Sequence, residues 1–598
     1  DVPRSVHRRS RLAGSLDRRR RARRTAMCDD VSRFEILEGL CPSGRPCLIP
    51  DTERRGISLS QLVSLVKLLR SRSNDSGVIE NWKESASGQP VRLQTVNLYH
   101  LNALLIMPAT TFWSCSYVEL VSTSAEEQVP EFFVSHWWGE PVVHFVMCLQ
   151  KFSDARQLKR PVFWVCAYAN NQHNLHQDVS ADPSQSSFRK AMEISRGTVL
   201  VLDSAATPFK RVWCAFEIYT TLQDASKTLD IVTFVADSAD AMPEVHKVDL
   251  QPKAGGAGSH GEVLGVSGGR AELITEGFIA DDHRKGVRVQ VGHVTRPASP
   301  SDLKALREST FPLDVAYRGY GTDVEHAKAS VAADRVHILN SIASSVSLDE
   351  EPPKEHSKYR DVNSTIRARF AVAVIVQVLR SGTPVDAERS LRVICEDLTR
   401  QGLDLQVPGS KFSDSNLRTL AECLPTGLKT LGLGLGGTSV TDEAGSGIKE
   451  VCRRLQNLRD FDVYVNSRAM TDSFLFGVAG GLTMSGNLAS LTLYLTSTGV
   501  GDAGAVALAN GVRGLRVLAK LQLGFSYTAI TDKGVAAIAD AASSMSSLRD
   551  FGITANNTKV GDDAARAVGK ALTSLAQVTK IWVGFYKTSV GSEGSDAV

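Results

Sequence analysis

The sequence has few cysteines, and none of them is paired at a spacing used for metal or redox chemistry. Its 598 residues include ten cysteines. None forms a Cys-x-x-Cys pair or a zinc-finger cluster with histidine, so neither a disulfide framework nor a structural zinc is indicated. Most lie inside apolar runs, where a free thiol behaves as a small hydrophobic side chain. This usage fits a reducing compartment, and we expect a cytoplasmic protein without a bound metal.

Long hydrophobic runs and a phosphate-binding loop are also missing. A membrane-spanning helix needs roughly 20 apolar residues, whereas the best uninterrupted runs, Phe370–Val376 and Ala103–Met107, are much shorter. We therefore predict no membrane span. No glycine-rich loop ends in Gly-Lys-Ser/Thr, so an ATP-driven switch is not expected. The composition, with 42% hydrophobic and 22% charged residues, is instead that of a chain with packed cores.

Negative charge is scarce at the N-terminus. Residues 1–26 hold ten arginines and two aspartates, a net charge of +8, which leaves 3 − 8 = −5 for the remainder. We expect this segment to be a disordered basic tail, either a targeting peptide or sequence upstream of Met27, that contributes nothing to folding. A nucleic-acid partner is not expected beyond this tail.

The chain then divides by pattern into an N-terminal extension and an α/β segment. Residues 27–128 are an extension, partly helical, with an amphipathic helix over Ile57–Leu69. Short apolar runs separated by helix-length polar stretches follow within residues 129–245, which predicts a parallel sheet flanked by helices. The predicted strands are Phe132–Ser135, Val162–Ala169, Thr198–Asp203 and Ile231–Val235.

The next segments connect this sheet to the C-terminal third. Residues 246–310 are predicted to be a glycine-rich linker or insertion, because seven of the fifteen residues 255–269 are glycine. Residues 311–399 are predicted to be a helical connector, with helices over Asp323–Ser345 and Val362–Leu379. Residues 400–598 form an internal repeat.

The repeat has a period of 30 residues. Apolar positions alternate and then recur four apart, which predicts one strand and one helix per unit. An aspartate stands before each predicted helix and is placed as its N-cap. The unit starts are Leu428, Leu458, Leu488, Leu518, Leu548 and Val578, and the aspartates are Asp442, Asp472, Asp502, Asp532 and Asp562.

This pattern resembles the leucine-rich repeat of the ribonuclease-inhibitor type, which implies an α/β solenoid with its strands on a concave face. Threonine stands where that family usually has asparagine, except at Arg468. Alternate side chains of each predicted strand lie on the exposed face of the sheet, where aromatic residues and acids are mixed. This mixture suits a protein or basic peptide partner, although a plain soluble surface is the alternative. The candidate partner-binding residues are Tyr464, Tyr494, Trp582, Asp460, Asp462 and Asp550.

A second resemblance lies within residues 129–240. The Glu-x-Ser-Arg pattern ending at Arg196, the strand to Asp203 and the Trp-Cys-x-x-Glu element ending at Glu217 resemble the plant-like Toll/interleukin-receptor (TIR) domain. This resemblance implies a flavodoxin-like parallel sheet. Some members of that family cleave NAD at the nicotinamide–ribose bond with this glutamate, whereas others are non-catalytic adaptors that self-associate.

The resemblance makes Glu217 the candidate catalytic residue and NAD the candidate substrate, with no bound cofactor. A carboxylate at a ribose hydroxyl would stabilise the positive charge that develops as the bond breaks. Gly139 and Glu140 come just past one predicted strand and Asp203 ends another, at the edge where open parallel sheets bind ligands, so these three residues are candidate nucleotide contacts.

A different enzyme class is also open. His136 lies at the end of one predicted strand and Cys166 near the end of the next, so they could form the base and thiol of a Cys–His peptidase-like enzyme. A buried core cysteine is the alternative. His173, His176 and Asp178 lie in a polar segment and are expected to be solvated rather than metal ligands. The sequence thus predicts a recognition and signalling protein, with a non-catalytic scaffold as the main alternative.

Overall fold

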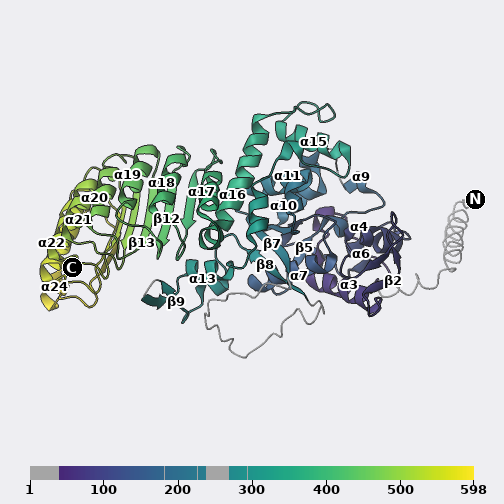
Figure 1. Cartoon of the computed structure of the whole chain (residues 1–598), viewed down its shortest axis with the longest axis horizontal. Coiled ribbons are helices and arrows are strands. Elements are labelled where there is room, and N and C mark those ends of the chain that lie inside the picture. Colours follow the sequence, from purple (N-terminus) through teal and green to yellow (C-terminus); the bar gives the residue numbers. More distant parts are fainter. Residues whose placement is uncertain are drawn as a thin grey trace, which may run out of the picture. The chain divides into compact units, whose positions relative to one another are not determined.

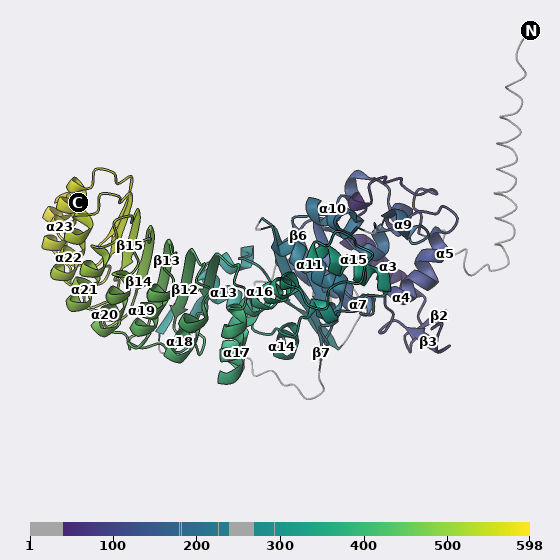
Figure 2. The ribbon, with the colours of Figure 1, turned by 90° about the horizontal axis from the view of Figure 1, so that it is seen from above.

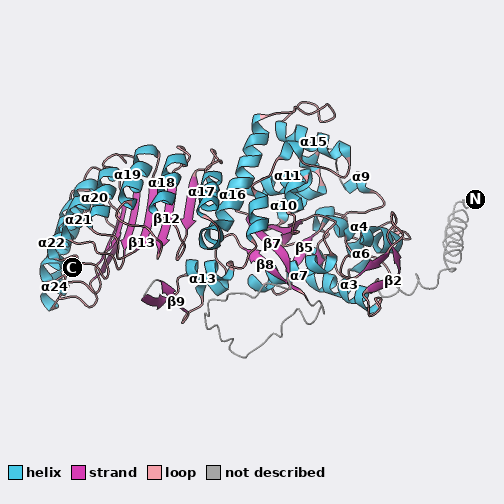
Figure 3. Ribbon diagram, viewed as in Figure 1, coloured by secondary structure: helices cyan, strands magenta, loops and turns pink. Residues whose placement is uncertain are grey.

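The structure is a computed structural model of the chain, and it describes residues 40–178, 180, 182–224, 226–237, 268–291 and 294–597. The basic tail and residues 255–267 of the glycine-rich segment lie outside the described residues. The chain forms two compact units. The first takes in residues up to Val134, Trp138–Val146 and Arg160–Arg196, and the second takes in Ser135–Trp137, Met147–Lys159 and the chain from Gly197 onward. Both contain helices and strands (Figures 1 and 3).

The first unit contains short strands covered by helices. β5 (Val162–Trp164) pairs in parallel with β4 (Phe132–Ser135) and antiparallel with β1 (Ile57–Ser58), while β2 (Val78–Lys83) and β3 (Pro90–Arg92) form a separate antiparallel pair. Its helices are α3 (Leu59–Ser71), α4 (Leu98–Leu101), α5 (Met107–Thr110), α6 (Tyr117–Val121), α8 (Cys166–Ala169), α9 (Leu175–Asp178) and α10 (Ser187–Ile194). α7 (Val142–Ala155) follows β4.

Two of the predicted elements in this unit are shifted. The helix predicted to begin at Ile57 begins at Leu59, because Ser58 and Gln61 form a capping box at its N-terminus. The strand predicted over Val162–Ala169 ends at Trp164, and a helical turn begins at Cys166. An apolar run of this length does not by itself distinguish a buried strand from a buried helix.

From Gly197 onward, the second unit has three strands that lie side by side. β6 (Gly197–Leu202) pairs in parallel with β7 (Thr228–Ala236), which pairs antiparallel with β8 (Gly269–Ile274). α11 (Val212–Leu222) connects β6 to β7. From β8 onward, the segment predicted as a glycine-rich linker or insertion over residues 246–310 is folded, with Ala271, Leu273 and Ile274 buried, so a plain linker is excluded there. β9 (Arg288–Val291), β10 (Val294–Pro297) and α13 (Pro300–Arg307) follow.

Four helices follow β10 and α13 in the connector: α14 (Leu313–Gly319), α15 (Ala332–Ala343), α16 (Ser357–Ser381) and α17 (Pro384–Ile394). The helix predicted from Asp323 is wrong at its start, because residues 324–326 form a single 3-10 turn and α15 begins later. The short 3-10 and π-helical turns elsewhere are η1 (Thr52–Arg54), η2 (Asn102–Ile106), η3 (Glu126–Gln128), η4 (Pro183–Gln185), η5 (Thr207–Lys210), η6 (Ala280–His283) and η7 (Val324–His326).

α16 is the central helix of the connector. Within the described part of the chain it is the one helix with the length and composition of a membrane span, and it contains the apolar run Phe370–Val376 that was judged too short for one. More than half of its most apolar stretch is buried, and Phe370 packs edge-on against Phe209 with ring centroids 5.0 Å apart. The core helix of a water-soluble protein passes the same composition test. One continuous hydrophobic core joins α11, the connector and the repeats.

The C-terminal region is a seven-stranded parallel sheet that alternates with helices, so the predicted α/β class is confirmed there. Figure 2 shows the helices along the outside of a curve and the strands along its inside. The strands, in spatial order, are β11 (Gly402–Gln406), β12 (Thr430–Gly436), β13 (Asp460–Asn466), β14 (Ser490–Leu495), β15 (Lys520–Gly524), β16 (Asp550–Thr554) and β17 (Lys580–Gly584). The helices are α18 (Asp414–Cys423), α19 (Ala444–Arg454), α20 (Asp472–Leu482), α21 (Asp502–Val512), α22 (Asp532–Ser543), α23 (Asp562–Ser574) and α24 (Ser592–Ala597).

The repeat aspartates cap the following helix rather than their own. Asp502 accepts the backbone N–H groups of Thr531 at 2.8 Å and Gly534 at 3.0 Å, together with the Thr531 hydroxyl at 2.6 Å. Asp442 makes the same three contacts two units earlier, with Thr471 and Phe474. The prediction that these carboxylates accept backbone N–H groups at a helix start is therefore correct, but the helix is that of the next unit. Parallel pairing of the strands places each aspartate beside that unit.

The turns after the strands carry the repeat threonines. The hydroxyls of Thr438, Thr498, Thr528, Thr558 and Thr588 each donate to the carbonyl three residues earlier. The residue before each of these threonines has a positive φ, between 54° and 70°. Ser467, which precedes the exceptional Arg468, is not among the positive-φ residues, so this turn has a different backbone from the other five.

Candidate functional site

The strand face of the repeats carries a stacked pair of tyrosines. Tyr464 and Tyr494 are register partners on β13 and β14, and their rings stack with centroids 5.3 Å apart and an angle of 10°. The ring of Tyr494 extends over Gly524, its register partner on β15. Because a β-carbon at Gly524 would collide with that ring, the glycine provides the space in which it lies. We call Tyr464, Tyr494 and Gly524 the tyrosine platform.

Two buried oxygen atoms lie beside this platform. Asp462 and Thr492 are register partners on the same two strands, two residues before the tyrosines. Asp462 Oδ1 and Thr492 Oγ1 are both buried, and neither has a hydrogen-bond partner among the described residues. Burial raises the pKa of Tyr464 and of Tyr494, and the charge of Asp462 adds to both shifts. The site thus combines an aromatic surface with an unsatisfied acceptor, which carries a desolvation cost.

The other candidates for partner binding lie further along the sheet. Asp460 is half-buried on β13, two residues before Asp462 and on the same face of the strand. Asp550, on β16, accepts a hydrogen bond from Gln522. Trp582 is 66% exposed on β17, the last strand, four strands away from Asp462 in the same row. The structure therefore brings Tyr464, Tyr494 and Asp462 together and places Trp582 at the far edge.

Glu217 lies in the first half of α11 and is 5% exposed. Its Oε2 accepts a hydrogen bond of 2.6 Å from the Ser135 hydroxyl. Burial raises the pKa of Glu217 to about 8, and the Ser135 hydrogen bond opposes that shift. At neutral pH the side chain is mostly protonated, so the negative charge expected of it forms only as the pH approaches 8.

The residues of the alternative Cys–His site have structural contacts of their own. His136 is buried, and burial lowers its pKa to about 4, so its ring is neutral at neutral pH. Its carbonyl accepts a contact of 3.6 Å from the Cys214 thiol. Cys166 begins α8, where its Sγ accepts a 3.1 Å hydrogen bond from the Trp138 indole.

The predicted nucleotide contacts and polar loop residues are also engaged in the fold. Asp203 accepts hydrogen bonds of 2.6 Å from both the N–H and the hydroxyl of Thr207, which hold the turn after β6. Glu140 is buried and Gly139 is half-buried, in the turn after β4. His173 contacts the Thr110 hydroxyl at 2.8 Å. Asp178 accepts the N–H of Asn171 at 2.6 Å and is 11% exposed, so the expectation of a solvated side chain is wrong for it.

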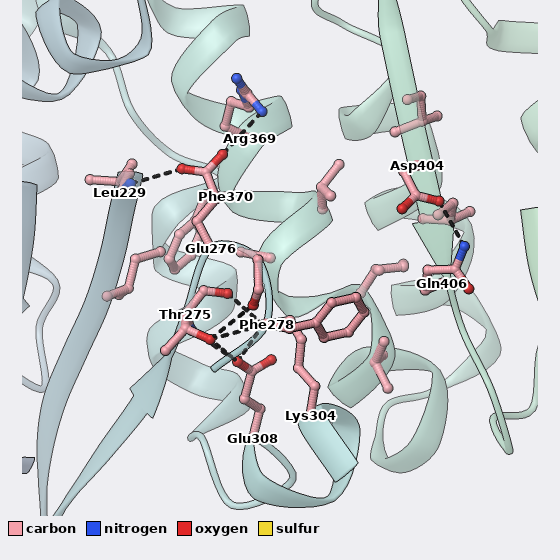
Figure 4. Close-up of a pocket in the computed structure, with 18 of the residues that line it drawn as sticks. Leu229, Thr275, Glu276, Phe278, Lys304, Glu308, Arg369, Phe370, Asp404 and Gln406 are labelled. Atoms are coloured by element: carbon pink, nitrogen blue, oxygen red, sulfur yellow. Dashed lines mark hydrogen bonds and ion pairs between the residues drawn. The ribbon is translucent and has the colours of Figure 1, made fainter. Parts of the chain in front are cut away.

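The sequence analysis overlooked Thr492 and the role of Gly524 beneath the Tyr494 ring, although a signal for both was present. Adding one period of 30 residues to Asp462 and to Tyr494 gives Thr492 and Gly524, so each side-chain row can be read from the repeat. A cavity lined by residues from β7 to β11 (Figure 4) has no such local signal.

Comparison with models of protein families gives no match, and a search of curated proteins finds no similar sequence.

Proposed function

We propose that this chain is a recognition protein whose repeat strand face binds a protein partner through a basic segment. The tyrosine platform beside the unsatisfied Asp462 carries the proposal. An arginine of the partner would stack on the tyrosine rings and donate a charge-assisted hydrogen bond to Asp462 Oδ1. The arginine would thus supply a donor to the buried acceptor and cover the aromatic surface. Aromatic residues and arginine are the residue types enriched at interface hot spots.

The fold families proposed for the two α/β regions rest on particular features. The 30-residue strand–helix period and the threonine turns support a solenoid of ribonuclease-inhibitor-type leucine-rich repeats. The parallel pairs β4·β5 and β6·β7, with α11 after β6, support a TIR-like domain that signals by self-association. We place the protein in the cytoplasm because of its free thiols. A scaffold whose two regions only bind protein is the alternative.

Peptide binding to the full chain tests the recognition proposal. We expect fluorescence polarisation to show tighter binding of arginine-containing peptides than of acidic peptides of equal length. Tyr464→Ala together with Tyr494→Ala should weaken this binding by about tenfold or more, which corresponds to about 1.4 kcal/mol. Tyr527→Ala is the matched control, because Tyr527 is exposed in a turn outside β15. Equal binding of basic and acidic peptides would contradict the proposal.

A second candidate function is cleavage of NAD by Glu217. The buried carboxyl with a raised pKa favours it, because such groups cluster at catalytic sites. The carboxylate would stabilise positive charge on the ribose once it is deprotonated, so nicotinamide release should increase as the pH rises toward 8.

Glu217→Gln keeps the shape and the contact with Ser135 but removes the charge. We expect it to abolish nicotinamide release with little change in melting temperature. If Glu217→Gln retains the parent rate, or if Cys166→Ala alone abolishes activity, the glutamate assignment is wrong and the Cys–His alternative replaces it. If the parent releases no nicotinamide, the scaffold alternative remains.

A further inference from the structure

A cavity of about 330 Å³ lies in the second unit, between the three-strand sheet, the connector helices and the first repeat strand. This volume is at the small end of the range for ligand pockets, roughly 300 to 1,000 Å³. Figure 4 shows side chains from β7, the loop after β8, α13, α16 and β11 around one space. The walls are mainly apolar, and Phe278, which is 45% exposed, lines the cavity from the loop after β8.

Two of the three cations that line the cavity are neutralised by carboxylates in its wall. Lys304 donates to Glu308 Oε1 at 2.5 Å and also to the Thr275 carbonyl. Arg369 Nη1 lies 3.5 Å from Glu276 Oε1. Figure 4 shows both pairs at the cavity wall. These four charged groups cancel, so they give the cavity no net charge.

The third cation, Arg400, pairs with Asp397, which does not line the cavity. The Arg400 side chain is only 7% exposed, and its Nε lies 3.7 Å from Asp397 Oδ2. Arg400 Nη2 is buried and has no hydrogen-bond partner among the described residues. Burial lowers the pKa of Arg400, Asp397 opposes that shift, and the positive charge of Arg369 adds to it. A buried guanidinium with an unused donor and a second cation nearby is stabilised by an anion.

We propose that this cavity binds a small organic carboxylate, with its carboxylate on Arg400 Nη2 and its apolar body against the walls. A single negative charge suits the site, because Asp404, the wall carboxylate outside those two pairs, would repel a dianion such as phosphate twice as strongly. Apolar residues on β7, α16 and β11 would contact the rest of the ligand. This site is independent of the tyrosine platform and does not depend on the function proposed for it.

Calorimetric titration of the full chain with phenylpropanoate tests the proposal. Phenylpropanol, which has the same shape without the charge, is the ligand control. We expect phenylpropanoate to bind with a dissociation constant below about 1 mM and at least about tenfold more tightly than the alcohol. Arg400→Gln should weaken acid binding by at least about tenfold. Arg418→Gln is the matched protein control, because Arg418 is an exposed side chain on a repeat helix.

A second variant keeps the test decisive if Arg400→Gln fails to fold. Ala373 lines the cavity from α16 and is partly exposed, so Ala373→Leu narrows the space without changing any charge. It should also weaken acid binding by at least about tenfold. Equal affinity for the acid and the alcohol, unchanged binding in Ala373→Leu, or no binding of the acid at about 10 mM would each overturn the proposal.

Discussion

Tyr494 lies over Gly524, and a β-carbon added at Gly524 would stand 2.2 Å from Cδ1 of the tyrosine ring. The position of the ring therefore depends on a residue 30 positions later in the sequence, on the next strand. Since Tyr464 stacks on Tyr494, moving one ring removes the support of the other. The geometry of the tyrosine platform is thus set by backbone spacing as well as by its aromatic side chains.

Gly524→Ala should displace the Tyr494 ring while leaving both tyrosines in the sequence. We expect arginine-peptide binding to weaken by about tenfold and the free energy of unfolding to fall by about 1–3 kcal/mol, from overpacking. Fluorescence polarisation and urea denaturation measure the two effects. Gly514→Ala is the control, because a β-carbon there has no neighbour closer than 4.0 Å. Parent-like binding by Gly524→Ala would show that the platform does not contribute to binding.

Asp502→Ala should destabilise the repeats. Two backbone N–H groups and the Thr531 hydroxyl lose their acceptor at the start of α22. We expect urea denaturation to show a loss of about 1–3 kcal/mol. Asp563→Ala removes an exposed aspartate one residue after the corresponding position of α23 and should change stability by less than about 0.5 kcal/mol. Similar losses in the two variants would contradict a capping role between repeats.

Glu217 should make stability depend on pH in the neutral range. With a folded pKa of about 8, the native state binds the proton at pH values where the unfolded glutamate, with an ordinary pKa of about 4.5, has released it. The contribution of this group therefore decreases as pH rises, by about 1.4 kcal/mol per unit between about pH 5 and pH 8. Denaturation of the parent and Glu217→Gln across this window measures the difference. A difference that is independent of pH would mean that Glu217 is ionised throughout.

Arg156→Met should leave a buried charge without its main partner. Asp230 is fully buried and accepts hydrogen bonds from Arg156 Nη2 at 2.7 Å and Nε at 2.9 Å. We expect a loss of about 3–5 kcal/mol at neutral pH. Burial already raises the pKa of Asp230, so the loss should diminish in acid, where the carboxyl is neutral.

The double variant Arg156→Met, Asp230→Asn is the companion measurement for this pair. It should recover part of the stability that Arg156→Met loses, because the uncompensated charge is gone. No recovery would show that the cost comes from packing around the arginine stem.

The repeats and several strands could be predicted because their signals are local. Phe132–Ser135 coincides with a strand of the structure, and the 30-residue period places each repeat strand. The Val162–Ala169 run could not be divided correctly, because it is apolar throughout and periodicity is uninformative there. β8 was not predicted, because the glycine-rich composition before it suggested a linker or insertion. Its partner, β7, lies on the other side of that glycine-rich segment.

The candidate sites were less accessible from the sequence. The tyrosines were found because the alternation of side chains along a strand places them on the exposed face. The role of Asp462 depends on Oδ1 having no hydrogen-bond partner among the described residues, which only the packed structure shows. The pKa of Glu217 depends on burial and on Ser135, 82 residues earlier. Arg400 and Lys304 reach one cavity from segments almost a hundred residues apart, with no shared motif.

The aspartates that cap the following helix also bear on how this protein can evolve. Each unit supplies an acceptor to the next unit and receives one from the unit before, with donor and acceptor 29 residues apart at Asp442, Asp472, Asp502, Asp532 and Asp562. A whole unit duplicated in the gene would find matching groups at both junctions, whereas an insertion of a few residues would break two of them. The array can therefore gain or lose length by duplication and deletion of complete units, and the exposed strand positions can vary in sequence while the junctions stay the same.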